Sequence, residues 1–398
     1  MSLTRAPNQS LPGVLALPAH RRPAAAALSH AFGVVAMSLA LCFSAGGAGA
    51  QSVEQGGIGG KALVGAQAAA REYWTPERMR NAKPLPLPRA SAAPMPLLPD
   101  ETARAAAAPS RSAAGKPPSV QVTPDLQPLF EPLPDDQSGG VEAQDVGSRG
   151  AQFSSSRVFP DGATTTYPYR AIGKLFFTKP GGGDFICSAA VQRRRVVTTA
   201  GHCVHAGNGN ANAYYTNFQF VPAYRSGIAP YGRWTPVFVA TTQAWINGGA
   251  TFPNAADFAM FDMADRNGSK IGDVTGYLGY LTNKLRPNHA HLVGYPANLD
   301  SGERMHQVAA QSFAADGPNA VVYGSDMTGG SSGGPWIQNL GVPAVGQTGG
   351  TNALGNVLIG VTSYGPVASG VLYQGSSIPA AAFTALLTQV CGRRAGNC

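Results

Sequence analysis

A serine enclosed by glycines constrains what this chain can fold into. Residues 328–335 read Thr-Gly-Gly-Ser-Ser-Gly-Gly-Pro, with Ser332 between Gly330 and Gly334. Glycines let the backbone turn sharply, expose one hydroxyl and direct its own N–H groups toward an anion. Most clusters of glycine and serine are loops or linkers. The chemistry of this segment therefore depends on the groups that the rest of the chain brings to it.

Two further segments supply a base and an acid. His202 lies in Thr-Thr-Ala-Gly-His-Cys at 198–203, and Asp257 stands directly before Phe-Ala-Met-Phe at 258–261. Either one alone is more often a structural side chain or a turn residue. Together with Ser332 they place His, Asp and Ser in that order, each beside an expected strand. All seven His residues precede Ser332, which excludes the lipase-type Gly-x-Ser-x-Gly elbow because its His follows the Ser.

Short apolar or alternating runs separated by turn residues predict an all-β fold for residues 158–398. The length suits two antiparallel β-barrels, one at about 158–275 and one at about 276–398. The best helix candidate is 380–390, near the C-terminus. The expected strands are 171–177, 195–199, 214–221, 234–241, 258–262, 290–294, 320–323, 358–364 and 370–373.

The three blocks resemble the trypsin/chymotrypsin-like serine peptidase superfamily. Residues 164–173, Thr-Thr-Thr-Tyr-Pro-Tyr-Arg-Ala-Ile-Gly, and the block at Asp257 resemble its bacterial glutamyl-endopeptidase branch. The resemblance implies a chymotrypsin-like fold and a secreted serine endopeptidase that forms an acyl-enzyme without metal or cofactor. Ser332 would be the nucleophile, His202 the base and Asp257 its partner, with an oxyanion hole made by the N–H groups of Gly330 and Ser332. The alternative is a catalytically silent binding protein of this fold.

Substrate preference is harder to predict. Residues 363–365 resemble the strand that pairs with an extended substrate in this superfamily, but glutamyl endopeptidases carry a His where this chain has Thr362. Asp326, six residues before Ser332, matches the place of the acid that binds Arg or Lys in trypsin-like enzymes. Arg or Lys is therefore slightly favoured over Glu. The expected substrate-binding residues are Asp326, Thr328, Thr362, Ser363 and Gly365.

Cys187 and Cys203 bracket an expected β-hairpin whose turn is 193–195, three arginines. The resemblance implies a disulfide between them that ties the histidine loop, and Cys391 and Cys398 remain for a second bridge. A metal site made of His202, Cys203 and His205 is disfavoured, because neighbouring residues do not easily face one ion and no second ligand pair appears. The arginines are expected to form a solvated tip, so the net charge of +8 does not indicate nucleic-acid binding.

The first 50 residues have the pattern of a signal peptide. Two arginines at 21–22 precede an apolar run at 24–43, and small residues then offer a cleavage site before Gln51. This predicts export to an oxidising extracellular or periplasmic compartment, with no stable membrane insertion after cleavage. The run is also long enough to be retained as an anchor, so the two outcomes remain open.

Residues 51–157 are rich in Pro and Ala and lack apolar periodicity. This composition predicts a disordered propeptide or linker. Only 71–80 has the pattern of a docking helix, with Tyr73, Trp74 and Met79 as its apolar contacts. We expect a zymogen, cut near the Arg157–Val158 bond, in which the propeptide acts in cis. The expected partners are peptide or protein substrates, and the active form is expected to be a monomer.

Overall fold

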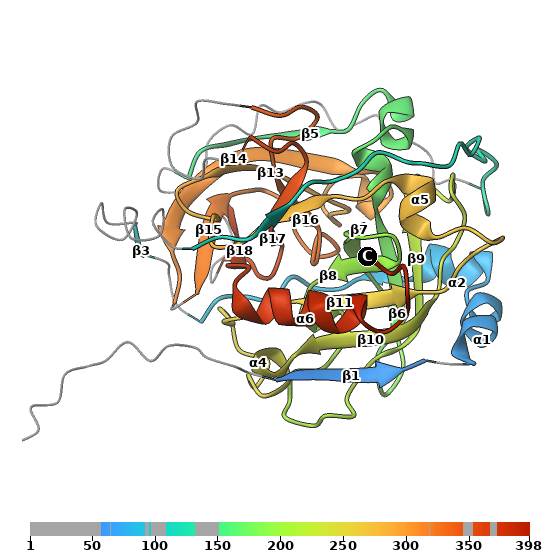
Figure 1. Ribbon diagram of the computed structural model, residues 1–398, viewed down its shortest axis with the longest axis horizontal. Coiled ribbons are helices and arrows are strands. Elements are labelled where there is room, and N and C mark those ends of the chain that lie inside the picture. The colour runs from blue at the N-terminus through green and yellow to red at the C-terminus, as the bar shows by residue number, and fades with distance from the viewer. Residues whose placement is uncertain are drawn as a thin grey trace, which may run out of the picture. The chain divides into compact units, whose positions relative to one another are not determined.

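The chain is described here from a computed structural model that covers residues 57–63, 65–91, 95–96, 109–131, 151–317, 319–344, 353–366 and 372–398. The expected signal peptide lies outside these ranges. The described chain is mainly β, in two curled sheets with few helices (Figure 1). This confirms the predicted all-β class. No helix within the described ranges is long and apolar enough to cross a membrane.

The first sheet is built mostly from the strands expected between residues 171 and 263. Nearly every side chain of these strands is buried, as in the apolar run Ile-Gly-Lys-Leu-Phe-Phe-Thr at 172–178. Its strands are β1 Ile58–Ala62, β2 Lys83–Pro84, β6 Ile172–Thr178, β7 Asp184–Val191, β8 Val196–Thr199, β9 Thr216–Pro222, β10 Pro236–Thr242 and β11 Ala259–Met263. They lie in the order β1-β10-β11-β8-β7-β6-β9, and β2 pairs with β7.

The second sheet holds the later strands and three from the pro-region. Its strands are β3 Met95–Pro96, β4 Ser112–Ala113, β5 Phe153–Arg157, β12 Gly279–Leu281, β13 His289–Gly294, β14 His306–Ala315, β15 Ala320–Gly324, β16 Pro335–Gln338, β17 Val357–Val361 and β18 Tyr373–Ser377. Their order is β18-β15-β14-β13-β16-β17-β12-β4, with β3 and β5 on β14. The three pro-region strands were not predicted, and neither were β12, β14 and β16. β14 is rich in Ala and Gln, whereas β12 and β16 are very short.

Residues 370 and 371 of the strand expected at 370–373 lie outside the described ranges, Leu372 is not in a strand, and Tyr373 is. The strand is β18, which begins at Tyr373 and carries Gln374, Ser376 and Ser377 as buried polar side chains. These side chains hydrogen-bond inside the protein, so the segment has no apolar alternation to reveal it.

The predicted C-terminal helix is present as α6, Ala381–Cys391. Its apolar face, Phe383, Leu386 and Val390, packs on the first sheet against β10 and β11 (Figure 1). The other α-helices are α1 Ala66–Tyr73, α2 Pro76–Asn81, α4 Gln243–Ile246 and α5 Ile271–Thr275, and short 3-10 turns lie at Asp161–Thr165, Tyr169–Ala171, Gly201–Cys203 and Asp300–Gly302.

The hairpin and both disulfides expected from the cysteines are present. β7 pairs antiparallel with β8, and Cys187–Cys203 ties β7 to the turn that follows β8. Cys391 and Cys398 form the second bridge at the end of α6.

The prediction of a solvated arginine tip on this hairpin is wrong. Arg193 is buried against the rings of Tyr277 and Tyr280, Arg194 pairs with Asp273, and Arg195 pairs with Asp265. The tip therefore packs on neighbouring segments and is not a free basic patch.

Removal of the first disulfide should destabilise the protein. Replacing Cys187 and Cys203 together by Ala frees a loop of 16 residues and is expected to lower the free energy of unfolding by about 2–5 kcal/mol. The matched double substitution at Cys391 and Cys398, which close a loop of only 7 residues, should cost less. Urea denaturation of the two variants measures the difference, and an equal or reversed ranking would contradict the expectation.

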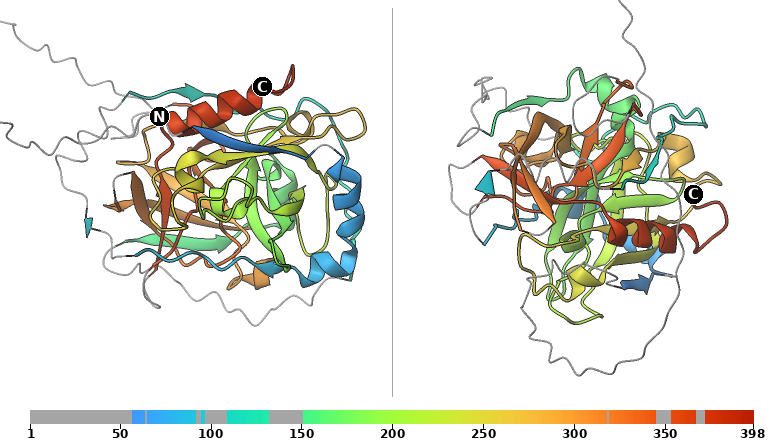
Figure 2. Two further views of the ribbon diagram at one scale, coloured as in Figure 1. Left: turned by 90° about the horizontal axis from the view of Figure 1, so that it is seen from below. Right: turned by 60° about the vertical axis from the view of Figure 1, so that its left-hand side comes forward.

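The pro-region is more ordered than its composition predicts. The expected docking element is confirmed: Trp74 and Met79 are buried in an apolar cluster of the domain, and the Tyr73 hydroxyl donates to Asp184 at 2.7 Å. Figure 2 shows α1 and α2, in blue, lying against the domain. Beyond this element, β1 and β4 pair with β10 and β12. Such contacts use backbone groups at strand edges, so they leave no periodic pattern in the sequence.

The predicted processing bond lies at the end of a paired strand. β5 pairs with β14 over five register positions, Arg157 forms an ion pair with Asp300 at 2.9 Å, and the Val158 N–H donates to the Met305 carbonyl at 2.9 Å. A cut between Arg157 and Val158 would leave this strand held to the second sheet by non-covalent contacts alone. The start of the active form, and the domain limits at 158 and 275, stay predictions.

Candidate active site

His202 lies in the 3-10 turn that follows β8, next to the bridged Cys203. Its ring Nδ1 is 2.8 Å from Oδ2 of Asp257, and its backbone N–H donates to Oδ1 of the same carboxylate at 2.9 Å. The ring is buried, and its Nε2 has no hydrogen-bond partner among the described residues. A proton on Nδ1 that is held by a carboxylate leaves Nε2 free to act as a base.

Asp257 stands just before β11 and is fully buried. In addition to its two bonds with His202, it accepts the hydroxyl of Ser363 at 2.5 Å. A buried carboxylate needs such donors because burial without them is costly. The Ser363 hydroxyl thus supports the acid, and the expectation that residues 363–365 pair with an extended substrate stays a prediction.

Ser332 lies in the loop between β15 and β16 and is fully buried. Its Oγ, like Nε2 of His202, has no partner among the described residues. Its carbonyl accepts the Ser188 N–H at 2.7 Å. The next residue, Gly333, lies so close to β8 that a Cβ there would be 2.0 Å from Thr199 Oγ1. These contacts bring the serine loop from the second sheet onto the strand that leads into His202.

The fold is identified by the two sheets and by the places in them that supply these three residues. His202 and Asp257 come from the ends of β8 and the start of β11 in the first sheet, whereas Ser332 comes from a loop of the second. This chain has the chymotrypsin fold. Two curled antiparallel sheets, a histidine hairpin closed by Cys187–Cys203 and a C-terminal helix complete it.

Solved structures that this chain resembles include several proteases. They include the protease Anisep from Arthrobacter nicotinovorans, 31% identical, with 56% of this chain and 95% of that chain covered and a TM-score of 0.45. A second is the thermostable serine protease AL20 from an extremophilic microorganism, which is 28% identical, with 52% of this chain and 91% of that chain covered and a TM-score of 0.43. A third is a Glu endopeptidase, which is 21% identical, with 59% of this chain and 95% of that chain covered and a TM-score of 0.44. No protein-family model and no curated protein matches the chain.

Within the chymotrypsin fold, Gly330 lies in a turn with a left-handed backbone conformation. Its φ is +90°, and a Cβ there would lie 2.5 Å from the Tyr295 carbonyl oxygen, so only glycine fits. Its carbonyl accepts the Ser188 hydroxyl at 2.9 Å, and Ser188 Oγ in turn accepts the Tyr295 N–H at 3.0 Å. Ser188 therefore holds the Gly330–Ser331 peptide, which links the two residues that carry the expected oxyanion donors. Sequence reasoning missed it, although it directly follows Cys187.

A buried chain of hydrogen bonds holds the residue before the nucleophile. Trp336 Nε1 donates to Thr362 Oγ1 at 3.0 Å, and Thr362 Oγ1 donates to Gln374 Oε1 at 3.3 Å. Gln374 Nε2 donates to Ser331 Oγ at 2.7 Å, and Ser331 Oγ donates to the Thr328 carbonyl at 2.6 Å. A neutral network thus supports the serine loop. Sequence reasoning missed Gln374, because a lone Gln in a polar strand carries no distinctive signal.

Three other expected substrate-binding residues differ in their burial and in their hydrogen-bond partners. Gly365 has both backbone groups bonded to the pro-region. Thr328 is exposed and donates to Asn298 at 2.7 Å. Asp326 is buried, and its Oδ1 lacks a partner among the described residues. Burial raises the pKa of Asp326 above its usual range, and a hydrogen bond from Ser155 in β5 partly offsets this.

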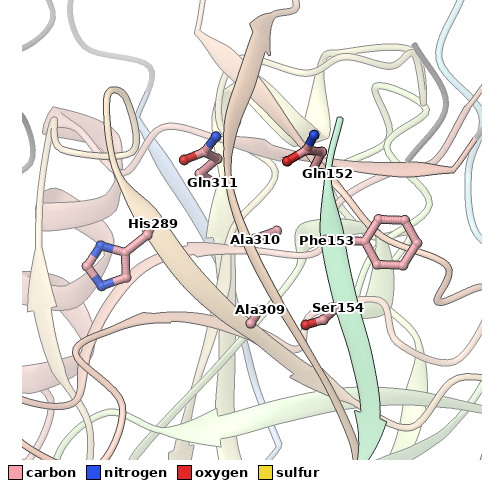
Figure 3. A pocket seen from close by; sticks show the side chains of 7 residues that line it. All are labelled: Gln152, Phe153, Ser154, His289, Ala309, Ala310 and Gln311. Carbon is pink, nitrogen blue, oxygen red and sulfur yellow. The ribbon is translucent and has the colours of Figure 1, made fainter. Parts of the chain in front are cut away.

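Two other features of the described residues, a group of possible metal ligands and a pocket, lie outside the chemistry of the candidate site. Donor atoms of Cys187, His202 and Cys203 lie within 4.8 Å of one another, but both cysteines are used in a disulfide and metal binding needs free thiolates. A cavity of about 470 Å³ lies elsewhere, at β5, β13 and β14 (Figure 3). It is lined by Gln152, Phe153, Ser154, His289, Ala309, Ala310 and Gln311, none of which belongs to the candidate site.

Proposed function

We propose that this protein is a serine endopeptidase that hydrolyses peptide bonds through an acyl-enzyme on Ser332. One observation carries the proposal: His202 Nε2 and Ser332 Oγ are buried atoms without hydrogen-bond partners among the described residues, while Nδ1 of the same ring is held by Asp257. Unsatisfied buried polar atoms are costly and rare in proteins, and catalytic sites are one place that retains them.

The residues can perform each step of acyl transfer. Nε2 of His202 takes the proton of Ser332 Oγ as this oxygen bonds to the substrate carbonyl carbon. The carbonyl oxygen becomes an anion and is received by the N–H groups of Gly330 and Ser332. The C–N bond then breaks, and the amine leaves with the proton from Nε2. Water repeats the sequence on the acyl-enzyme, which releases the acid and restores Ser332.

A fluorophosphonate that reacts with activated serines tests the proposal directly. Hydrolysis of peptides, together with covalent labelling mapped to Ser332 by mass spectrometry, supports it. The alternative, a catalytically silent binding protein of this fold, predicts neither hydrolysis nor labelling after the pro-region has been removed.

We also propose that the protein is exported to an extracellular or periplasmic compartment and acts there as a monomer on peptides or proteins. Two disulfides support this location, because such bridges persist in oxidising compartments. The signal-peptide pattern of residues 1–50 supports the route.

For specificity, we propose that Asp326 recognises Arg or Lys. Its unpartnered buried carboxylate oxygen would gain a counter-charge from such a side chain. Asp326→Asn keeps the shape and removes the charge, so kcat/KM for Arg and Lys substrates should fall about 100-fold, with little change for apolar substrates. A mixed peptide library measures both. A wild-type preference for Glu, or an equal loss for all substrates, would contradict the assignment.

A further inference from the structure

A proline-rich stretch of the pro-region crosses the candidate site. This segment, residues 83–91 with sequence Lys-Pro-Leu-Pro-Leu-Pro-Arg-Ala-Ser, is called the strap below. It begins as β2, which pairs with β7 at Phe185 and Ile186. Its backbone then bonds to the serine loop, to Gly365 and to Phe252. The strap therefore contacts, one after another, β7, the serine loop, Gly365 and Phe252.

The strap occupies the groups that a substrate needs. The Gly330 N–H, expected to receive the oxyanion, donates to the Leu85 carbonyl at 3.0 Å. The Gly365 N–H donates to the Pro88 carbonyl at 2.7 Å, and its carbonyl accepts the Ala90 N–H at 3.0 Å. No substrate can use these groups until the strap has left.

Side chains of the strap reinforce the closure. Leu85 is buried in the core cluster of the first sheet, and Leu87 Cδ2 would lie 2.6 Å from a Cβ on Gly365. Ala90 is buried in a cluster with Trp245 and Phe252, whose rings lie edge-on to His202 at 6.1 and 5.7 Å. The strap thus packs on rings that contact the histidine, in addition to the serine loop.

The alternating prolines suit this role. Proline fixes φ and lacks an N–H, so a Pro-x-Pro-x-Pro run is already extended and loses little entropy on binding. Prolines lie at 84, 86 and 88, whereas the donors that the strap uses belong to Leu85, Ala90 and Ser91. Every required N–H therefore falls on a residue that has one.

The strap is also a poor substrate. The carbonyl at Gly330 belongs to the Leu85–Pro86 bond, so attack there would have to expel the ring nitrogen of a proline. Both pairings of the strap are parallel, β2 with β7 and Arg89 with Gly365. The strap can remain in the site of an otherwise complete peptidase.

We propose that the candidate cleft is a binding site for this proline-alternating segment, with the Leu85 carbonyl in the oxyanion hole, and that the strap keeps the full-length protein inactive. The proposal rests on the proposed peptidase function for its inhibitory part only. The binding part stands on the contacts above, so the two can be tested separately.

Hydrogen exchange tests binding without any activity. In full-length Ser332→Ala protein, which cannot process itself, we expect slow exchange at the amides of Leu85, Ala90, Gly330 and Gly365. Adding Ala90→Pro removes one donor and should speed exchange at the three remaining amides, those of Leu85, Gly330 and Gly365, about tenfold. The matched Arg89→Pro, at an N–H that carries none of these bonds, should not. Fast exchange of these amides in the Ser332→Ala protein would overturn the proposal that the strap binds in the cleft.

Labelling tests inhibition. In intact full-length protein, Leu85→Asp should raise the rate of fluorophosphonate labelling about tenfold or more over wild type, as should Ala90→Pro. The matched Leu126→Asp, at a pro-region leucine that is 51% exposed, should label at the wild-type rate. Thermal unfolding confirms that each variant is folded. Equal labelling of wild type and both strap variants would overturn inhibition. Slow exchange with no labelling of any variant would contradict the peptidase proposal and leave the strap as a ligand of the cleft.

Discussion

Replacing Ser332 by Ala is expected to lower kcat for peptide hydrolysis by about 10⁴-fold or more and to abolish fluorophosphonate labelling. Its Oγ has no hydrogen-bond partner among the described residues, as suits a group that must reach a substrate. Removal of the nucleophile leaves only binding and the oxyanion hole to assist the reaction. Initial rates on the protein freed of its pro-region measure the loss.

Ser331 is the matched control for this change. Its hydroxyl already donates to the Thr328 carbonyl and accepts from Gln374, so Ser331→Ala should loosen the loop and lower activity by only about tenfold. Labelling should persist in this variant. Labelling that vanished with Ser331→Ala and persisted with Ser332→Ala would reverse the assignment of the nucleophile.

The second large effect is expected at the acid. Asp257→Asn should lower kcat about 10⁴-fold, because an amide in place of the carboxylate offers an N–H to Nδ1 and favours the tautomer that protonates Nε2. Folding should be largely retained, since the amide keeps the size of the carboxylate. Steady-state kinetics and thermal unfolding of the same preparation separate the two effects.

Asp265→Asn controls for the loss of a charge near the histidine hairpin. Asp265 pairs with Arg195 at the hairpin tip, and its substitution should change kcat less than tenfold. Ser363→Ala removes one donor from Asp257, and its kcat should lie between those of Asp257→Asn and Asp265→Asn. If Asp257→Asn and Asp265→Asn reduced kcat equally, Asp257 would have only a structural role.

The sequence revealed the parts of this protein that depend on local pattern. Strands such as β6 and β11 are apolar runs between turn residues, and the blocks around His202, Asp257 and Ser332 carry recognisable neighbours. The docking element was visible because Trp74 is a large apolar residue in a polar, proline-rich context.

What the sequence could not reveal depends on contacts between distant backbone groups. Ser188 and Gln374 matter through their hydrogen bonds to the serine loop, and neither stands in a motif. The strap follows the composition of a solvated linker, yet its carbonyls and N–H groups meet strand edges that the sequence does not show to be available. Asp326 illustrates the remaining gap, because its position in the sequence suggests a substrate pocket, whereas its hydrogen bond with Ser155 in β5 depends on a distant strand.

The strap belongs to the same chain as the site that it covers, and this has a consequence for dilution. A tethered segment faces its site at an effective concentration set by the tether, typically about millimolar, whatever the protein concentration. A full-length molecule therefore stays closed even when it is released into a large volume. One covalent cut between Ser91 and the peptidase domain, such as the expected cut near Arg157–Val158, changes this. Once the segment leaves, its return becomes a bimolecular event that slows as the fragments spread. Once the cut fragment has diffused away, the site stays open, and no further chemical step is needed to keep it so.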